Sequence, residues 1–145
     1  MSLNNIFDVA GSGMNAQSVR LNTTASNIAN ADTASSSTED VYRARHPVFK
    51  ASFNQMLGHS QEGLNPQDET AGVAVLGIVE SDAPLQPRYE PDHPMANEDG
   101  YVYYPNVNVV EEMTNMISAS RSFQMNVDVL NSAKQMMQRV LSIGQ

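Results

Sequence analysis

Apolar side chains recur every three or four residues at both ends of the chain. Residues 4–30 carry a heptad pattern in which one seam position is apolar and the alternate position is small or polar. The apolar seam consists of Phe7, Met14, Leu21 and Ile28, and the alternate seam of Ala10, Gln17 and Thr24. At a rise of about 1.5 Å per residue, this pattern predicts a helix of about 40 Å.

The last forty residues carry a more continuous version of the same pattern. Its main stripe alternates steps of four and three residues and consists of Val109, Met113, Met116, Ser120, Phe123, Val127, Leu130, Lys134, Met137 and Leu141. A flanking line adds Val110, Ile117, Met136 and Val140. Asn108, followed three residues later by Glu111, has the form of an N-cap with a reciprocal acid, and Gly144 suits a helix end. The pattern predicts a second helix of about 50 Å.

Two helices of this length are too long for the core of a compact chain of 145 residues. The composition agrees, because 41% hydrophobic residues, 6% aromatic residues and no Trp supply little large apolar surface for a self-contained core. We therefore predict that the two ends pair into a rod in the manner of a coiled coil, either parallel or antiparallel.

The middle of the chain has a different character. All seven prolines lie between residues 47 and 105, and proline breaks helices, so this region is expected to form strands and loops. Strands are predicted at 41–49, 72–81, 84–90 and 100–105. The strand at 72–81 is apolar on both faces, which predicts that it is covered on both sides. The predicted fold class is α+β.

Two polar segments without periodicity are predicted to be flexible connectors, residues 34–40 and 54–71. The chain then divides into an N-terminal helical segment at 1–33, a β-rich middle segment at 34–105 and a C-terminal helix at 106–145.

The net charge of −8 is unevenly distributed. Residues 1–30 and 106–145 are each neutral, whereas residues 31–105 hold twelve acidic and four basic residues. An acidic, solvated middle argues against nucleic acid as a partner, because nucleic-acid binding depends on clustered Lys and Arg. The neutral ends are able to pack beside copies of themselves without charge repulsion.

The chain lacks the patterns of a catalytic or cofactor site. The histidines His46, His59 and His93 have no metal-ligand spacing, and the absence of cysteine excludes disulfides and thiolate metal sites. No GxSxG elbow occurs, and the sequence AGSGM at 10–14 lacks the spacing and lysine of a phosphate loop. We predict no enzymatic activity, no metal, no cofactor and no small-molecule substrate. The small residues at 11–13 indicate either a local bend or a close helix approach, and we favour close approach.

Neither a membrane span nor a cleavable signal is evident. No stretch approaches the roughly 20 apolar residues needed to cross a bilayer, and residues 1–13 lack a basic and an apolar region. The protein is expected not to be embedded in a membrane, and either to stay in the cytoplasm or to be exported by a route that reads no such signal.

The end of the first predicted helix, RLNTTASNIANADT at 20–33, is unusually polar for a helix that packs in a core. Its short hydroxyl and amide side chains are Asn22, Thr23, Thr24, Ser26, Asn27 and Asn30. Groups of this kind need partners or water when they are buried. We expect them to bond to other copies of the chain or to face a wet surface.

Four stretches resemble the rod, hook and filament proteins that form the axis of the bacterial flagellum. They are FDVAGSGMNAQSVRLNTTASNIANADT (7–33), YRARHPVF (42–49), GVAVLGIVES (72–81) and GYVYYPNVNVVEEMTNMISASRSFQMNVDVLNSAKQMM (100–137). ASNIANADT is similar to the axial family generally, whereas YPNVNVVEEM followed by ASRSFQ is similar to its proximal rod subunits. A TPGY turn often follows NIAN in the family, but here ASSSTEDVY follows instead.

The resemblance implies a structural subunit of the flagellar rod that polymerises through its terminal helices, transmits torque and lines the export channel. It implies export through the flagellar type III apparatus without a cleaved signal, and a place in the periplasmic part of the basal body. The implied partners are other copies of the chain and sister rod subunits, with basal ring or export gate proteins as indirect neighbours. In isolated axial subunits the terminal segments are typically disordered and fold on assembly.

The expected assembly interface combines the apolar seams with the amides at the end of the first helix. Its residues are Phe7, Met14, Leu21, Asn27, Ile28, Asn30, Met113, Ile117, Phe123, Val127, Leu130, Met137 and Leu141. The alternative hypothesis is a soluble coiled-coil binding module or adaptor that forms a finite oligomer.

Overall fold

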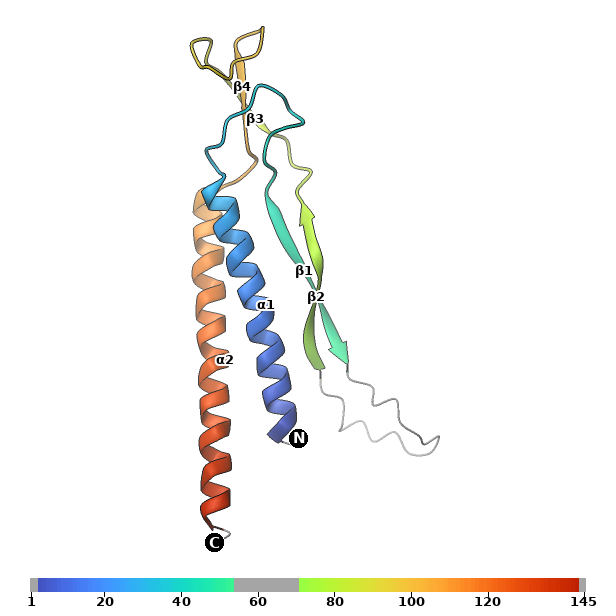
Figure 1. The fold of residues 1–145 in the computed structure, drawn as a ribbon, viewed down its shortest axis with the longest axis vertical. Helices are drawn as coiled ribbons and strands as arrows, with labels where there is room; N and C mark the ends of the chain where they lie inside the picture. Colours follow the sequence, from blue (N-terminus) through green and yellow to red (C-terminus); the bar gives the residue numbers. More distant parts are fainter. Residues whose placement is uncertain (1–2, 54–70, 144–145) are drawn as a thin grey trace, which may run out of the picture.

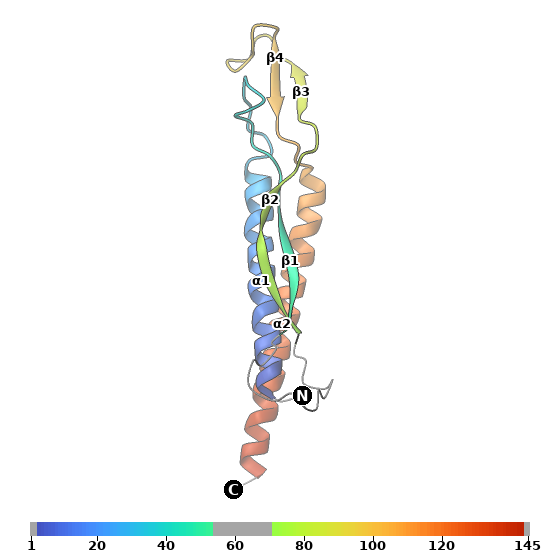
Figure 2. The same ribbon diagram turned by 90° about the vertical axis from the view of Figure 1, so that its right-hand side faces the viewer.

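The computed structural model describes residues 3–53 and 71–143. Its elements are, in chain order, α1 (Leu3–Ala29), β1 (Arg45–Phe53), β2 (Ala71–Glu80), β3 (Gln86–Tyr89), β4 (Tyr101–Tyr104) and α2 (Val109–Ile143). The molecule is elongated, with the two helices side by side and the β1–β2 hairpin along α1 (Figures 1 and 2). The β3–β4 hairpin forms a tip beyond the end of α1 and the start of α2. These elements confirm the α+β fold class.

The helices are antiparallel, and their bounds lie close to the predicted ones. Arg20 donates a 2.9 Å hydrogen bond to Oδ1 of Asn115, which joins the last third of α1 to the start of α2. The predicted N-cap is confirmed, because Oδ1 of Asn108 accepts bonds from the backbone N–H groups of Val110 (3.1 Å) and Glu111 (3.4 Å). These bonds satisfy two of the amides that a helix start leaves without partners.

The buried face of α2 is rotated slightly from the predicted stripe. Its buried residues are Glu112, Ala119 and Ala133, with Met116, Phe123, Val127, Leu130 and Met137 half-buried between them. Met113, Lys134 and Leu141, which were predicted to pack on α1, are exposed instead. Near Met113 and Lys134, the small size of the alanines lets α1 approach over them and leaves the longer neighbouring side chains outside the contact, whereas Leu141 lies beyond the start of α1.

The close helix approach predicted for residues 11–13 is confirmed at Gly13. A Cβ atom added at Gly13 would lie 2.9 Å from Nδ2 of Asn126, whereas one added at Gly11 would have no atom within 4 Å. Ser12 lies on the β-hairpin side of α1, where its Oγ accepts a 3.1 Å bond from the backbone N–H of Val73. Residues 11–13 therefore let α1 contact both α2 and β2 at short range.

The β1–β2 hairpin starts later than predicted and is more exposed. β1 begins at Arg45 because the preceding Val41 and Ala44 are buried at the junction with the helices. The antiparallel register shifts between Val48 and Phe49, so that Leu76 of β2 has no partner. Leu76 is 64% exposed, and Ile78 and Val79 are each 52% exposed. The prediction that this strand is covered on both sides was wrong for the single chain, because α1 covers only one side of the hairpin (Figures 1 and 2).

The β3–β4 hairpin of the tip is tied to the segment that follows α1. Val102 in β4 is fully buried, and Gly100 adopts a φ of 80°, which suits glycine in the turn before that strand. Ser35 and Tyr103 exchange two backbone hydrogen bonds of 3.0 and 2.9 Å. The segment 34–40, predicted to be a flexible connector, is thus anchored near its start. The predicted connector 54–71 falls outside the described residues, except for Ala71, which begins β2.

The glycine pair in α1 yields a matched test of helix packing. Gly11→Ala is expected to stabilise the folded chain by about 1 kcal/mol, because alanine favours the helix and meets no neighbour there. Gly13→Ala gains the same helix propensity, but its new Cβ atom presses against Asn126. Its net effect on the free energy of unfolding is therefore expected to be a smaller stabilisation or a destabilisation. Urea unfolding followed by circular dichroism, at a protein concentration at which the helices are formed, measures both. Equal stabilisation by the two substitutions would contradict the close approach of α2 at Gly13.

Candidate assembly interface

Asn27 fixes the crossing of three segments at the end of α1. Its side chain is fully buried, and its Nδ2 donates a 2.8 Å hydrogen bond to the backbone carbonyl of Arg45. Its Oδ1 accepts two further bonds, from the backbone N–H of Arg45 (2.9 Å) and from the hydroxyl of Tyr42 (2.8 Å). The amide therefore pairs with both backbone groups of the first residue of β1, as a neighbouring strand would.

The other polar groups in this part of α1 also find partners inside the chain. Ser26 bonds to the Tyr42 hydroxyl at 3.3 Å, and Asn30 donates a 2.8 Å bond to the backbone carbonyl of Ser26. The expected role of Asn27 in bonding to another copy is therefore corrected, because its buried side chain has no surface to offer. The polar composition of residues 22–30 is explained in large part by this internal network rather than by neighbouring subunits.

A second asparagine works in the same way at the start of α2, and the sequence patterns did not reveal it. Oδ1 of Asn106 accepts a 2.8 Å bond from the backbone N–H of Ala44. Its Nδ2 donates to the backbone carbonyls of Ser81 (3.2 Å) and Ala83 (2.8 Å). The one feature of the sequence that could have indicated this role is that Asn106 directly follows Pro105, which the structure shows to be buried. Asn27 and Asn106 together join the helices to the strands.

Every buried hydrophobic residue of the described chain is an alanine or a valine. They are Ala10, Ala16, Ala31, Val41, Ala44, Val102, Val107, Ala119 and Ala133. In contrast, nineteen hydrophobic residues among those described are exposed, and eleven of them are larger than valine. Soluble monomers rarely expose apolar side chains in continuous rows, and such rows usually mark an interaction surface.

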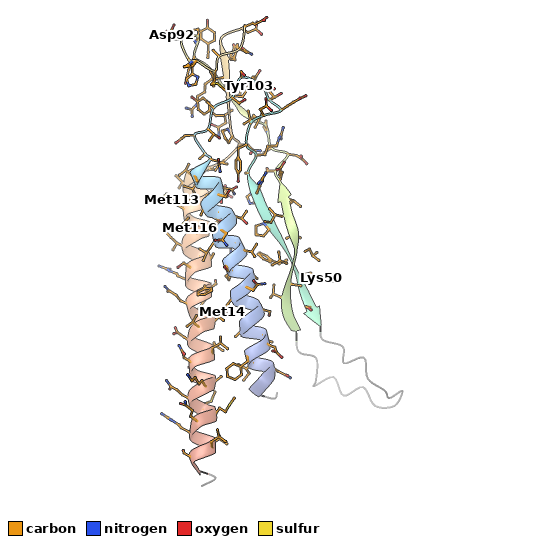
Figure 3. All side chains as sticks on the ribbon, in the orientation of Figure 1. Met14, Lys50, Asp92, Tyr103, Met113 and Met116 are labelled. Carbon is orange, nitrogen blue, oxygen red and sulfur yellow. The ribbon has the colours of Figure 1, made fainter. Side chains whose placement is uncertain are left out.

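Twelve of the nineteen exposed apolar residues form three groups. The first lies on the β1–β2 hairpin and consists of Val48, Phe49, Val73, Leu76, Ile78 and Val79. The other two lie at opposite ends of α2. The upper α2 patch is Val110, Met113 and Ile117, and the lower α2 patch is Met136, Val140 and Leu141. Figure 3 labels Met113 and Met116 near the start of α2, and Met14 near the middle of α1.

The residues predicted for the interface divide according to these surfaces. Phe7, Met14, Leu21, Ile28, Phe123, Val127, Leu130 and Met137 are half-buried on the two helices. Met113, Ile117 and Leu141 are exposed, whereas Asn27 is buried and Asn30 half-buried within the chain. Most of the predicted interface residues are thus partly covered by contacts within the helix pair. The three exposed residues belong to the upper and lower α2 patches.

Charge is separated along the molecule. The tip and its connections carry the exposed acids Asp32, Glu39, Asp40, Asp82, Asp92, Glu98 and Asp99. Asp92 lies at the far end of this region (Figure 3). At the tip, the Arg88 guanidinium stacks 4.5 Å from the ring centroid of Tyr104. Partial withdrawal from water raises the pKa of the Tyr104 phenol, and the carboxylate of Glu90, 3.3 Å from its hydroxyl, raises that pKa further.

The hollows of the surface are shallow and carry no catalytic arrangement. The larger, of about 330 Å³, lies between the helices and β1 and is lined in part by Arg20, Arg45 and the buried Glu112. The smaller, of about 130 Å³, lies between α1 and β2 beside Ser12. Within residues 3–53 and 71–143, no three His, Cys, Asp or Glu side chains gather in a way that would hold a metal ion. In the same ranges, neither helix is apolar enough along its length to cross a membrane.

Both ends of the chain match family models of flagellar rod proteins. Residues 7–34 match the model described as flagella basal body rod protein, and residues 98–143 match the C-terminal model described as flagellar basal body rod FlgEFG protein. These two stretches contain most of α1, all of α2 and the Asn27 and Asn106 side chains. The two matched stretches, with the helices and the Asn27 and Asn106 side chains that join them to the strands, thus define a protein of the flagellar basal-body rod class.

Comparison with complete proteins narrows this class. The chain is 48% identical over 145 residues to the flagellar basal-body rod protein FlgC of Salmonella typhimurium, with all of both chains covered. It is equally similar to the FlgC protein of Escherichia coli O6:H1, and 35% identical over 156 residues to that of Borreliella burgdorferi, with 100% and 99% of the two chains covered. The chain belongs to the family of flagellar basal-body rod protein FlgC. It is a structural subunit of the basal-body rod and not an enzyme.

The Asn27 network predicts a local sensitivity to substitution. Asn27→Ala is expected to destabilise the folded chain by about 2–4 kcal/mol, because it removes the fully buried amide that satisfies the backbone N–H and carbonyl of Arg45. Asn22→Ala, in the same helix but exposed, is the matched control and is expected to change stability by less than about 0.5 kcal/mol. Chemical unfolding, at a protein concentration at which the helices are formed, measures both variants. Similar small effects at the two positions would contradict the proposed role of Asn27.

Proposed function

We propose that the chain polymerises through its paired terminal helices into the inner part of the rod, transmits torque along it and lines the export channel. The observation that carries the proposal is the contrast between a core built of alanine and valine and the long rows of exposed apolar residues on α2 and the hairpin. A helix pair stabilised this weakly inside one chain needs further surfaces to cover it. Membership of the rod protein family supports copies of the chain and sister rod subunits as those surfaces.

The antiparallel α1–α2 pair is proposed to act as a coiled coil in the assembled rod. Half-buried residues at heptad spacing support this geometry, because Leu21 of α1 and Val127 and Leu130 of α2 lie on partly covered faces. Phe7, Met14 and Ile28 extend the row on α1, and Phe123 and Met137 extend it on α2. Faces that the pair leaves open, including Met113, Ile117 and Leu141, would then contact neighbouring subunits.

The acidic tip and the neutral helices suit different positions in such an assembly. Helices without net charge pack closely against copies of themselves, whereas an acidic tip repels other copies of itself and stays in water. We place the helices inside the tube and the β-rich segment, proposed as residues 34–105, outside. The proposed chain is exported without a cleaved signal and resides in the periplasmic part of the rod. It contacts basal ring or export gate proteins indirectly.

A finite coiled-coil module or adaptor is the alternative, and helix content in dilute solution distinguishes the two. α1 and α2 together contain 62 of the 145 residues. The rod hypothesis expects the isolated chain at micromolar concentration to show much less helix by circular dichroism, because its core is too small to hold the helices alone. Full helix content together with a single defined oligomer in size-exclusion chromatography would favour the adaptor.

Substitutions in the helix pair test polymerisation in the cell. Leu21→Asp and Val127→Asp are each expected to abolish motility and rod assembly, because an unpaired carboxylate in a packed helix face costs several kcal/mol. Export of the variant chain is expected to continue. Asn15→Asp and Ser118→Asp, at exposed positions of the same helices, are the matched controls and should permit swimming. Normal motility of both Leu21 and Val127 variants would overturn the proposal.

A further inference from the structure

A buried polar atom without a partner lies in the contact between α1 and α2. Oε1 of Gln17 is shielded from water and accepts no hydrogen bond from any residue that the structure describes. Among those residues, it is the one buried side-chain oxygen or nitrogen in this condition. Buried polar atoms in folded proteins nearly always have a partner, so an exception needs a physical reason.

Gln17 faces α2 near the middle of the contact between the helices. Gly13, one turn earlier on the same face of α1, lies against Asn126 of α2. The antiparallel register therefore places Gln17 opposite residues 119–122 of α2, where Ala119 is fully buried. The helix pair itself encloses the amide oxygen, so no second chain reaches this atom while the pair is closed.

The helix pair has little apolar burial with which to offset such a group. Ala10 of α1 and Ala119 of α2 are buried, but alanine removes only a small area from water. A buried amide oxygen without a donor lowers the folding equilibrium constant about tenfold. An apolar side chain of the same length suits this contact, because the half-buried Met14 and Met116 already lie on the two helices (Figure 3). The polar side chain at position 17 is therefore not required by the space between the helices.

We propose that Gln17 is a built-in weak point of the α1–α2 pair, which keeps the isolated chain close to its folding midpoint. The helices then open readily before assembly and stay closed once neighbouring chains cover their outer faces. This role rests on the proposed function, because passage through an export channel followed by polymerisation requires a helix pair that opens. In coiled coils, one polar residue at a seam position similarly lowers stability while it serves another purpose.

An osmolyte titration measures the effect of Gln17 on folding, whether or not the dilute chain is already folded. Trimethylamine N-oxide favours the folded state, and circular dichroism of the full chain at two micromolar concentrations follows its helix content. Gln17→Met keeps the side-chain length and the helix propensity but removes the amide. It is expected to raise the folding equilibrium constant about tenfold and to move the transition to lower osmolyte concentration. Gln124→Met, at an exposed position of α2, is the matched control and should leave the transition in place.

A suppressor experiment tests the role of the weak point in cells. Gln17→Met is expected to reduce export of the chain and to reduce motility, because a more stable helix pair opens less often. Ala25→Gly, at an exposed position of α1, lowers the folding equilibrium constant about fivefold without altering the contact with α2. The double variant is expected to regain motility, which would not happen if Gln17→Met acted by removing a specific contact. Gln124→Met should swim like the parent.

Four outcomes overturn the proposal. Gln17→Met leaves the osmolyte transition in place or moves it to higher concentration, or Gln124→Met moves it equally. A measurably more stable Gln17→Met chain is exported and supports swimming like the parent, or Ala25→Gly fails to restore motility to it. None of these results bears on the rod function, since Leu21→Asp and Val127→Asp test that function independently.

Discussion

The fold depends on the pairing of one buried amide with one backbone residue. Asn27 bonds to both the N–H and the carbonyl of Arg45, and so fixes where the chain that leaves α1 turns back as β1. Tyr42 closes the network by donating to the same amide oxygen. Because the Asn27 side chain is fully buried, the chain is unable to shift the hairpin along α1 without leaving that amide without partners. The position of the β1–β2 hairpin on the helix pair follows from it.

Close helix packing is the second constraint, and it leaves much of the apolar surface uncovered. Gly13, Ala119 and Ala133 allow the helices to approach, but small side chains bury little area. The larger apolar residues are consequently left on the outer faces of α2 and the hairpin. A rod subunit benefits from this distribution, because the free energy of burying those residues is gained only on assembly.

The elongated shape keeps unlike surfaces apart. The acidic tip and the apolar β1–β2 hairpin occupy different positions along the molecule (Figure 1). Asn106 lies between the tip and the start of α2 and bonds to Ala44, Ser81 and Ala83, so it holds the base of the β1–β2 hairpin beside the start of α2. Each surface is thereby presented at a fixed height to any neighbour along the rod.

The sequence by itself determined the two helices, the N-cap at Asn108 and the β-rich middle, because these follow from local periodicity, capping chemistry and the distribution of proline. It also identified the protein family through its two ends. Only the tertiary structure decided that the helices are antiparallel, that Ala119 rather than Met113 faces α1, and that Asn27 bonds within the chain. A heptad pattern does not distinguish helix directions, and the partner of an amide depends on residues distant in sequence. These three features depend on contacts between segments, which the spacing of residues along one segment does not determine.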